Sequence, residues 1–324
     1  MSSFDLRRLR YFVSVAELGS VTRAAKELYI AQPALSQHIK QLEEELGGAL
    51  FARTARGVQL TTLGAKLLVH TRTILNEIDV LLQDLKEAPP EPEGIVVIGM
   101  APTIGSVLTG GILEAVTTTL PNVRVQIRET MSRDIPELIR TAAIDYALSY
   151  DIAAERGISS SPIFFEDSFL VGSWAKAKAL NLQRGRDIPF DALSAIPLFL
   201  SSPANAFRDK LEQTALYHRF TLRIAAEVDS LTIRRDLALK GIAFTILSAT
   251  AIMAGSDDRD VYAARIVRPR IRRQICFVRP EGGTPSRAAQ EVAQLIDQTL
   301  RKLLSNSAWA GASRLRKSSL LNLS

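Results

Sequence analysis

A proline-rich break divides this chain of 324 residues into two stretches with different hydrophobic periodicity. The break is segment 88–94, in which three prolines and two glutamates interrupt any helix. Before the break, apolar residues recur at helical spacing. After it, β-rich runs alternate with helical stretches. We therefore predict an all-α N-terminal region and a larger α/β C-terminal region, each with its own core.

The N-terminal region begins with three amphipathic helices joined by tight turns. Apolar stripes predict one helix that ends at Gly19, a second that starts near Ser20, and a third that runs from Gln32 to the Gly47-Gly48 pair. The stripes consist of Leu9, Phe12, Val13 and Ala16, then Val21, Ala24, Ala25 and Leu28, then Leu35, Ile39, Leu42 and Leu46. Short helices joined by such a turn are typical of a helix-turn-helix unit.

The outer face of the third helix carries side chains suited to DNA. Opposite its buried stripe lie Gln32, Pro33, Ser36, Gln37 and Lys40. Glutamine can make two hydrogen bonds to adenine, serine can bind a base or a phosphate, and lysine can neutralise a phosphate. Proline offers apolar contact to a thymine methyl group. An ordinary solvated helix face is the alternative, because most surface helices have a polar side.

A short hairpin is predicted after the third helix. Alternating runs at 50–53 and 58–60 flank the Arg56-Gly57 pair, which is a hairpin signal. A hairpin that follows a helix-turn-helix forms a wing. The wing would bring Arg53 or Arg56 to the phosphates or into the minor groove of DNA.

A long helix follows the hairpin. Thr61 or Thr62 can cap it, and it is predicted to run to about residue 87. Its apolar residues repeat with heptad spacing, which predicts contact with a second copy of the chain. Packing on its own chain is the alternative. The predicted dimer residues are Leu67, Ile74, Ile78, Leu81 and Leu85.

The first sixty or so residues resemble the N-terminal domain of LysR-type transcriptional regulators. The motifs are Ala24-Ala25-x-x-Leu28, Gln32-Pro33-Ala34-x-Ser36-x-x-Ile39, Leu42-Glu43, Leu46-Gly47, Leu50-Phe51-x-Arg53, Leu60-Thr61 and Gly64. The resemblance implies contacts to bases or phosphates from Gln32, Pro33, Ser36 and Gln37, and backbone anchoring by Arg53 and Thr61. Many members have arginine where this chain has Gln37, so an arginine–guanine contact is lost there.

The C-terminal region has the alternating pattern of an α/β domain with mostly parallel sheets. Strands are predicted at 95–100, 123–129, 145–150, 168–172, 197–200, 223–228 and 243–247. Helices are predicted at 105–120, 134–143 and 286–304. Segment 94–113 is uncharged, but Pro102 and five glycines favour a buried strand and loop over a membrane span.

Ligands of such domains bind at the carboxyl ends of the strands, where helix N-termini present free N–H groups. By its weaker resemblance to the same family, this region would be a two-lobed effector domain like a periplasmic binding protein, with crossings near 164–166 and 267–270. The cleft residues carried over are Thr103, Ser202, Ser230 and Thr245. Helix capping is the alternative role for these hydroxyl side chains.

Three details qualify the resemblance of this region. Segment 227–247 is similar to the subgroup that regulates nitrogen and sulfur assimilation. Ser248 stands where proline is usual, and Ala143 where glycine is usual. The ligand is predicted to be a small anion, because hydroxyl groups and helix amides can hold one.

The predicted organisation therefore has five parts. These are a winged helix-turn-helix domain at 1–62, a dimerisation helix at 63–88, a hinge at 89–94, a two-lobed effector domain at 95–304 and a basic tail at 305–324. Lobe I takes 95–164 and 268–304, and lobe II takes 165–267. Residues 265–324 hold 12 Lys and Arg against 3 Asp and Glu, which suits a polyanion. For the tail itself we favour a solvated, mobile end.

Catalytic and metal-binding motifs find little support. His38, His70 and His218 are scattered without metal-ligand spacing, and no phosphate-binding glycine motif follows the first strand. Cys276 lies in an apolar strand context typical of a buried thiol. Glu17 interrupts the apolar stretch near the N-terminus, so we expect no signal peptide. We predict neither an enzyme nor a resident metal or cofactor.

We thus predict a cytoplasmic, sequence-specific transcriptional regulator. Its expected partners are double-stranded DNA, a small-molecule effector, further copies of itself in a dimer or tetramer, and RNA polymerase. A regulator without an effector, controlled by its own abundance, is the main alternative. A small-molecule-binding protein or an enzyme built on the α/β region is a more distant one.

Overall fold

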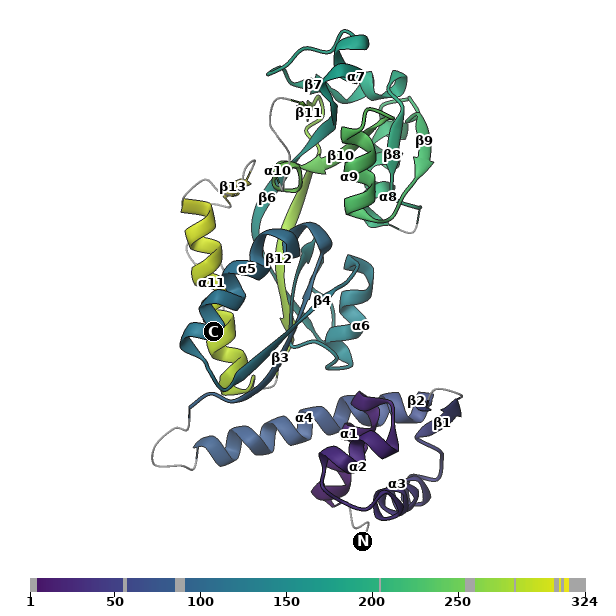
Figure 1. The fold of residues 1–324 in the computed structure, drawn as a ribbon, viewed down its shortest axis with the longest axis vertical. Coiled ribbons are helices and arrows are strands. Elements are labelled where there is room, and N and C mark those ends of the chain that lie inside the picture. The colour runs from purple at the N-terminus through teal and green to yellow at the C-terminus, as the bar shows by residue number, and fades with distance from the viewer. Residues whose placement is uncertain are drawn as a thin grey trace.

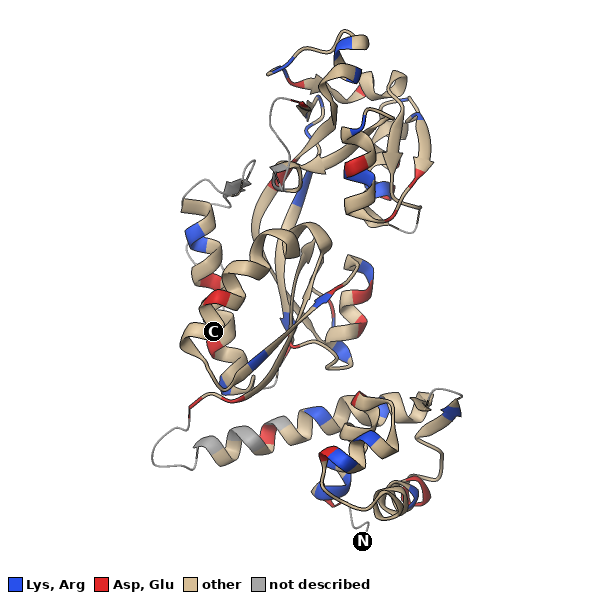
Figure 2. Cartoon of the chain, in the orientation of Figure 1, with Lys and Arg blue, Asp and Glu red and all other residues tan. Residues whose placement is uncertain are grey.

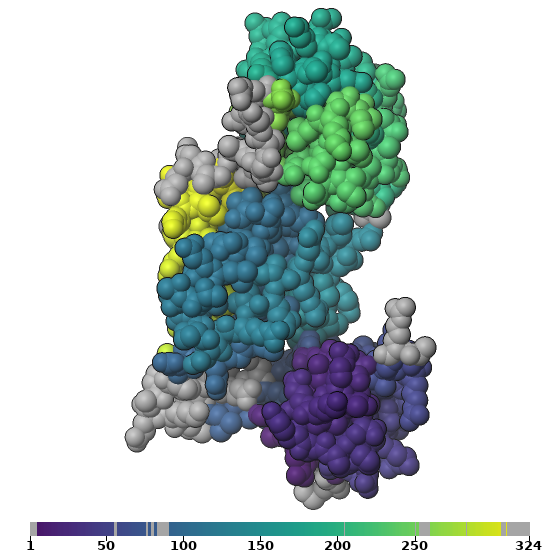
Figure 3. Space-filling view, in the orientation of Figure 1, coloured from purple at the N-terminus to yellow at the C-terminus, as the bar shows by residue number. Residues whose placement is uncertain are grey.

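The computed structural model describes residues 5–54, 57–84, 91–203, 205–253, 260–282, 284–305, 309 and 312–314. A small N-terminal head, residues 5–60, lies beside one end of a long helix (Figure 1). Two α/β lobes follow, one beyond the other along the longest axis of the molecule. In the space-filling view the head and the two lobes adjoin one another along the molecule (Figure 3).

The head is a three-helix unit with a hairpin. Its elements are α1 (Leu6–Leu18), α2 (Val21–Glu27), α3 (Gln32–Leu46), β1 (Phe51–Thr54) and β2 (Gly57–Leu60). Ser20 caps α2 by accepting a bond from the Arg23 amide, as predicted, and Gly19 ends α1 in the left-handed conformation. On α1, however, Val15 is buried while Val13 and Ala16 are only half-buried. The core of the head includes Leu9, Phe12, Ala24, Leu35, Ile39, Leu42 and Leu50.

The hairpin is attached to the helices by close backbone contacts. The Val58 amide donates to the Gly19 carbonyl, and a Cβ on Gly57 would come within 2.3 Å of that carbonyl oxygen. Only glycine fits at position 57, where φ is also +133°. The Glu43 carboxylate accepts the amides of Leu50 and Phe51 at 2.7 and 3.3 Å. The wing is therefore held in a fixed position relative to α3.

Helix α4 (Thr62–Asp84) leads away from the head. Thr61 caps it by accepting the Gly64 amide at 3.0 Å, and its hydroxyl donates to the Ala49 carbonyl at 2.6 Å. The first turns of α4 pack on the head through Leu63, Leu67 and Leu68. The head and the start of α4 thus share one core.

Lobe I is an α/β layer built around parallel strands. It contains β3 (Gly94–Met100), α5 (Pro102–Thr119), β4 (Val123–Glu129), the 3-10 turn Ser132–Asp134, α6 (Ile135–Arg140), β5 (Tyr146–Tyr150) and α11 (Arg287–Ser305). Strand β3 pairs in parallel with β4 and β5. Helices α5 and α11 pack together on one face of the sheet, and α6 lies on the other (Figure 1).

Lobe II repeats this arrangement on a smaller scale. Its elements are α7 (Trp174–Ala179), β7 (Ile188–Pro189), the 3-10 turn Phe190–Ala195, β8 (Leu198–Leu200), α8 (Ala206–Tyr217), β9 (Ile224–Glu227), α9 (Leu231–Leu239), β10 (Phe244–Ser248), α10 (Ala249–Met253) and β11 (Val261–Val267). Strand β8 lies between β9 and β10, and both pairs are parallel. Leu170, Phe190, Leu198, Leu211, Phe244 and Tyr262 are among the residues of its core.

Two long strands join the lobes and were largely missed by the sequence patterns. The strand predicted at 168–172 is only the end of β6 (Ile158–Ser173). Strand β11 was not predicted, and β12 (Arg272–Pro280) was indicated only by the strand context of Cys276, without bounds. Strand β6 pairs antiparallel with β10, β11 and β12. The prediction of mostly parallel sheets is therefore wrong, because the strands that connect the lobes run against their neighbours.

Buried carboxylates mark the point where β6 and β12 cross between the lobes. Glu166 and Asp167 are 1% and 5% exposed. Arg270 donates to Asp167 at 2.7 Å, and Arg265 lies 3.9 Å from the same carboxylate. Arg273 lies 3.9 Å from Glu166. These arginines account for part of the excess of Lys and Arg over Asp and Glu in residues 265–324. At the crossover they neutralise the buried charge of the two carboxylates.

Two further predictions need correction. The loop expected between the strand at 95–100 and the helix at 105–120 is instead the first turn of α5, because Pro102 takes a helix-start position where its missing N–H costs little. The mobile tail expected from residue 305 is wrong for Trp309, which is 2% exposed, and for β13 (Ala312–Arg314), which pairs with β6. The rest of that predicted tail lies outside the described residues.

We expect Arg270→Ala to lower the free energy of unfolding by roughly 1–2 kcal/mol, because it leaves the Asp167 carboxylate buried with a weakened partner. Urea denaturation followed by circular dichroism measures this loss. The control is Arg301→Ala, which removes an exposed i,i+4 pair with Asp297 and should cost no more than about 0.5 kcal/mol. Equal effects of the two substitutions would contradict this account of the crossover.

Candidate DNA-binding face and effector cleft

The outer face of α3 presents most of its predicted residues to solvent. Gln32, Pro33, Gln37 and Lys40 are exposed, and Ser36 is half-buried. The Gln32 side-chain amide donates to the Ser36 hydroxyl at 3.1 Å, and Lys40 pairs with Glu44 at 3.6 Å. The N-cap position is Ala31, which makes no side-chain cap. The first amides of α3 are therefore left for an outside acceptor such as a phosphate.

Two of the three residues predicted to contact the DNA backbone from the wing and its base are described in the structure. Arg53 is exposed on β1, whereas Arg56 lies outside the described residues. Thr61 is half-buried, and its hydroxyl is engaged in the α4 cap and with the Ala49 carbonyl. It holds the base of the wing. Figure 2 shows Lys and Arg along α1 and α2 and on β1.

Tyr29 was not among the predicted DNA-binding residues. It lies in the turn between α2 and α3 with φ of +54° and is 96% exposed, the largest value among the large hydrophobic side chains that the structure describes. An aromatic ring left in solvent beside the start of α3 suits contact with a DNA sugar or phosphate. In the sequence, Tyr29 could have been noticed only as an aromatic residue in the turn between two helices. Hydrophobic periodicity gives no information about turn residues.

Helix α4 exposes apolar side chains beyond the head. Ile74 and Leu81 are 41% and 55% exposed, and Leu82 is 51% exposed. Ile78 is half-buried. Leu67 packs against the core of its own head, and Leu85 lies outside the described residues. The apolar seam on α4 therefore divides into a part that belongs to the head and a part that faces solvent.

Arg72 of α4 links the head to lobe I. Its guanidinium donates to Glu17 of α1 at 2.7 Å and to the Ala142 carbonyl in the turn before β5. Ala142 has a left-handed φ of +48°. Close by, the half-buried Asp145 accepts the Val97 amide at 2.7 Å. Burial raises the pKa of Asp145, while that amide and Arg72 oppose the shift. One arginine thus joins α1, α4 and lobe I.

Thr103, the predicted cleft residue of lobe I, belongs to a buried polar group. The Tyr150 hydroxyl donates to Glu166 at 2.8 Å, and it also interacts with the Thr103 hydroxyl. Burial raises the pKa of Tyr150 well above its ordinary value, so its hydroxyl is a permanent donor. Arg273 lies over the Tyr150 ring at 3.5 Å and over the Phe207 ring of lobe II at 4.6 Å.

In lobe II, the predicted cleft residue Ser202 is hydrogen-bonded to Asp229. The Ser202 amide donates to the Asp229 carboxylate at 2.8 Å. Hydrogen bonds from Ser202, helped by Arg234 and by Arg133 of lobe I, lower the pKa of Asp229. Burial, with the positive charge of Arg273 nearby, lowers the pKa of Arg234 to about 10. Positive charge from both lobes therefore acts on Asp229, and sequence patterns did not single out these arginines for the predicted cleft.

The other two predicted cleft residues have structural roles. Ser230 caps α9 by accepting the Ile233 amide at 3.4 Å. Thr245 is fully buried and donates to the Phe199 carbonyl at 2.9 Å. These contacts match the capping alternative for Ser230 and leave no free donor on Thr245.

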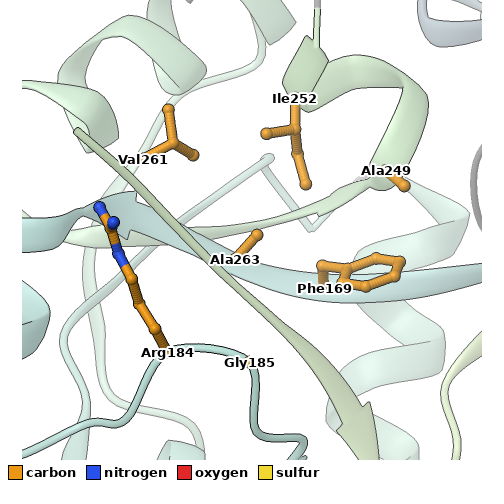
Figure 4. A pocket seen from close by; sticks show the side chains of 7 residues that line it. All are labelled: Phe169, Arg184, Gly185, Ala249, Ile252, Val261 and Ala263. Carbon is orange, nitrogen blue, oxygen red and sulfur yellow. The ribbon is translucent and has the colours of Figure 1, made fainter. Parts of the chain in front are cut away.

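A separate pocket lies within lobe II (Figure 4). It has a volume of about 330 Å³ and is lined by Phe169, Arg184, Gly185, Ala249, Ile252, Val261 and Ala263. Its walls are mostly apolar, and the Arg184 guanidinium lies over the Trp174 ring at 4.6 Å. None of the predicted cleft residues lines it.

Within the described ranges, no cluster of His, Cys, Asp and Glu side chains is arranged to hold a metal ion. No helix in this part of the chain is long and apolar enough to cross a membrane.

The head and lobes together define a helix-turn-helix regulator with an attached ligand-binding fold. Residues 6–65 match the model of the bacterial regulatory helix-turn-helix proteins of the lysR family, and residues 90–301 match that of the LysR substrate binding domain. The chain belongs to the LysR family of transcriptional regulators.

Similar proteins span nearly the whole chain. The nitrogen assimilation regulatory protein nac of Klebsiella aerogenes is 31% identical over 293 residues, covering 90% of this chain and 94% of its own. The hydrogen peroxide-inducible genes activator of Haemophilus influenzae is 25% identical over 308 residues, covering 93% and 98%. Full-length OxyR from Pseudomonas aeruginosa shares the fold, with a TM-score of 0.75 at 19% identity over 92% of this chain and 97% of that one. The resemblance to the nitrogen assimilation subgroup is thus supported.

We expect Arg72→Gln to loosen the contact between α4 and lobe I, because the amide cannot reach Glu17 and Ala142 together. Hydrogen–deuterium exchange of the full chain should show faster exchange in peptides that cover 140–146. Lys66→Gln, at an exposed position on the same helix, should leave those peptides unchanged. Unchanged exchange in the Arg72 variant would mean that this arginine does not connect the two parts.

Proposed function

We propose that this protein is a sequence-specific regulator of transcription that reads double-stranded DNA with α3 and anchors the wing on the DNA backbone. The observation that carries the proposal is the exposed polar face of α3, with uncapped amides at its start and Arg53 alongside on the wing. A DNA-binding role places the protein in the bacterial cytoplasm. The similarity to nac makes nitrogen assimilation genes the first targets to examine.

We further propose that two chains associate through the solvent-facing part of the α4 seam. Ile74, Leu81 and Leu82 would each lose apolar exposure in such a contact. A dimer would present two α3 helices to two half-sites. We also propose that the effector domains associate, so that two dimers form a tetramer, and that the protein contacts RNA polymerase.

The effector in this proposal is a small anion between the lobes. Arg133 of lobe I and Arg234 of lobe II both influence Asp229, so positive charge from the two lobes converges there. Among the described residues, the buried Nε atom of Arg234 has no hydrogen-bond partner. Such an atom favours a ligand with acceptor oxygens. An anion that binds both arginines would stabilise one separation of the lobes over another.

Cys276 does not have the properties of a peroxide-sensing cysteine. Peroxide sensing by cysteine needs an accessible thiolate. The sequence has a single cysteine, Cys276, which is buried in β12. Burial raises the pKa of its thiol, so less thiolate is present at any given pH than for an exposed cysteine. The one cysteine of this chain therefore does not supply the accessible thiolate that peroxide sensing requires.

Substitutions on α3 and on the wing should act differently on DNA affinity. Gln37→Ala should weaken binding to the operator by roughly 1–3 kcal/mol and leave binding to an unrelated duplex nearly unchanged. Arg53→Ala should weaken both duplexes alike and lower the salt slope by about one. Fluorescence anisotropy titrations at several salt concentrations measure both quantities. The opposite pattern would mean that the two residues have exchanged roles.

Leu81→Glu should shift the protein toward monomer, because it puts a charge into the exposed α4 seam. Sedimentation velocity of the full chain measures the change. Lys66→Glu, on the same helix but outside the seam, is the matched control and should keep the wild-type association. If both variants associate as the wild type does, α4 is not the contact between copies.

A further inference from the structure

The segment beyond α11 returns to the crossover between the lobes. Trp309 is 2% exposed and packs edge-on against Phe164 of β6, with ring centres 4.9 Å apart. Three residues further along, β13 pairs antiparallel with residues 164–166 of β6, with Ala312 opposite Glu166 and Arg314 opposite Phe164. Strand β12 pairs with the same stretch of β6. Trp309 and β13 together are called the strap here.

The strap makes a polar contact with the buried carboxylate of the crossover. The Trp309 indole N–H donates to Glu166 Oε1 at 2.9 Å, and the Tyr150 hydroxyl donates to Glu166 Oε2 at 2.8 Å. Each oxygen of one buried carboxylate is therefore held by a different part of the chain. Arg273, 3.9 Å from Oε2, supplies the opposite charge.

The contacts continue from Glu166 to Thr103, the predicted cleft residue. Tyr150 interacts with the Thr103 hydroxyl in the first turn of α5, and its ring lies beneath Arg273, which also contacts Phe207 of lobe II. A buried hydrogen-bonded group of this kind keeps one geometry only while all its members are satisfied. If Trp309 left, Glu166 would lose a charge-assisted partner, and Tyr150 would lose its fixed acceptor position.

We propose that the strap positions the effector cleft: through Glu166 and Tyr150, Trp309 fixes Thr103, while β13 stiffens β6 at the point about which the lobes move. Trp309 is thus a positioning residue that touches no ligand itself. The inference rests on the proposed function only in taking Thr103 as a cleft residue. The stiffening of the crossover follows from the pairing alone.

The test is hydrogen–deuterium exchange of the full chain, with no ligand or DNA needed. Trp309→Phe keeps the ring against Phe164 but removes the N–H donor. We expect peptides covering 164–166 and 102–106 to exchange roughly tenfold faster. Trp174→Phe changes the other tryptophan, at the start of α7, and should leave both peptides unchanged. A chain ending at Ser305 should show a larger change over 164–166.

A second measurement separates a positioning role from general loosening. Glutamine at position 166 has only one acceptor oxygen, so with the Trp309 N–H on that oxygen its amide nitrogen can only donate to the Tyr150 oxygen. Glu166→Gln therefore already takes away the acceptor to which the Tyr150 hydroxyl donates. Trp309→Phe should therefore add little to the exchange at 102–106 in a Glu166→Gln background. Full additivity of the two changes would overturn the link through Glu166.

The remaining outcomes are also decisive. Faster exchange at 164–166 with no change at 102–106 would overturn the positioning of Thr103. No change at either peptide, in Trp309→Phe and in the truncated chain, would overturn the strap altogether. If the protein proved not to bind specific DNA, the exchange results would stand, so the failure of the proposed function is a separate result.

Discussion

The pairing of Glu166 and Asp167 with arginines at the crossover is the interaction on which both lobes depend. Ionised carboxylates as deeply buried as these are costly unless opposite charge and hydrogen bonds compensate for the lost water. Arg270 precedes β12 and Arg273 lies within it, opposite Glu166 of β6, so neutralising the two carboxylates also sets how the two strands lie against each other. Because these are the strands that join the lobes, the same charges decide where lobe II stands relative to lobe I.

Lobe I therefore has two regions of contact, one with lobe II and one with α4 and the head. At the crossover, Arg273 lies between Tyr150 of lobe I and Phe207 of lobe II, and Lys210 of α8 reaches Asp151 at 3.3 Å. At the other end of lobe I, Arg72 joins α4, α1 and the turn before β5. In the proposed function, a ligand that favours one lobe geometry would change the head only if lobe I moves against α4. Arg72 is the contact through which that motion would pass.

Hydrophobic periodicity predicted the helices of the head and most of the short strands, because each is amphipathic or buried as a unit. It missed the first half of β6 and gave no bounds for β12 beyond the strand context of Cys276. Arg272 and Arg273 look like a surface charge run until Glu166, distant in sequence, is placed beside them. The helical spacing of apolar residues also predicted which face of α3 is exposed to solvent. It did not identify Tyr29, Arg72 or Arg234, because their significance depends on contacts or exposure that local patterns do not encode. Trp309 was missed because its partner Glu166 lies far away in the sequence.

The central claim is that paired α3 helices read DNA sequence. In-vitro selection of bound DNA from a random duplex library, carried out at low and at moderate salt, tests it most directly. We predict a palindromic motif that survives the higher salt, with half-sites separated by whole turns of the double helix. Binding that enriches no motif and disappears as salt rises would contradict the claim, because it would show that charge alone holds the protein on DNA.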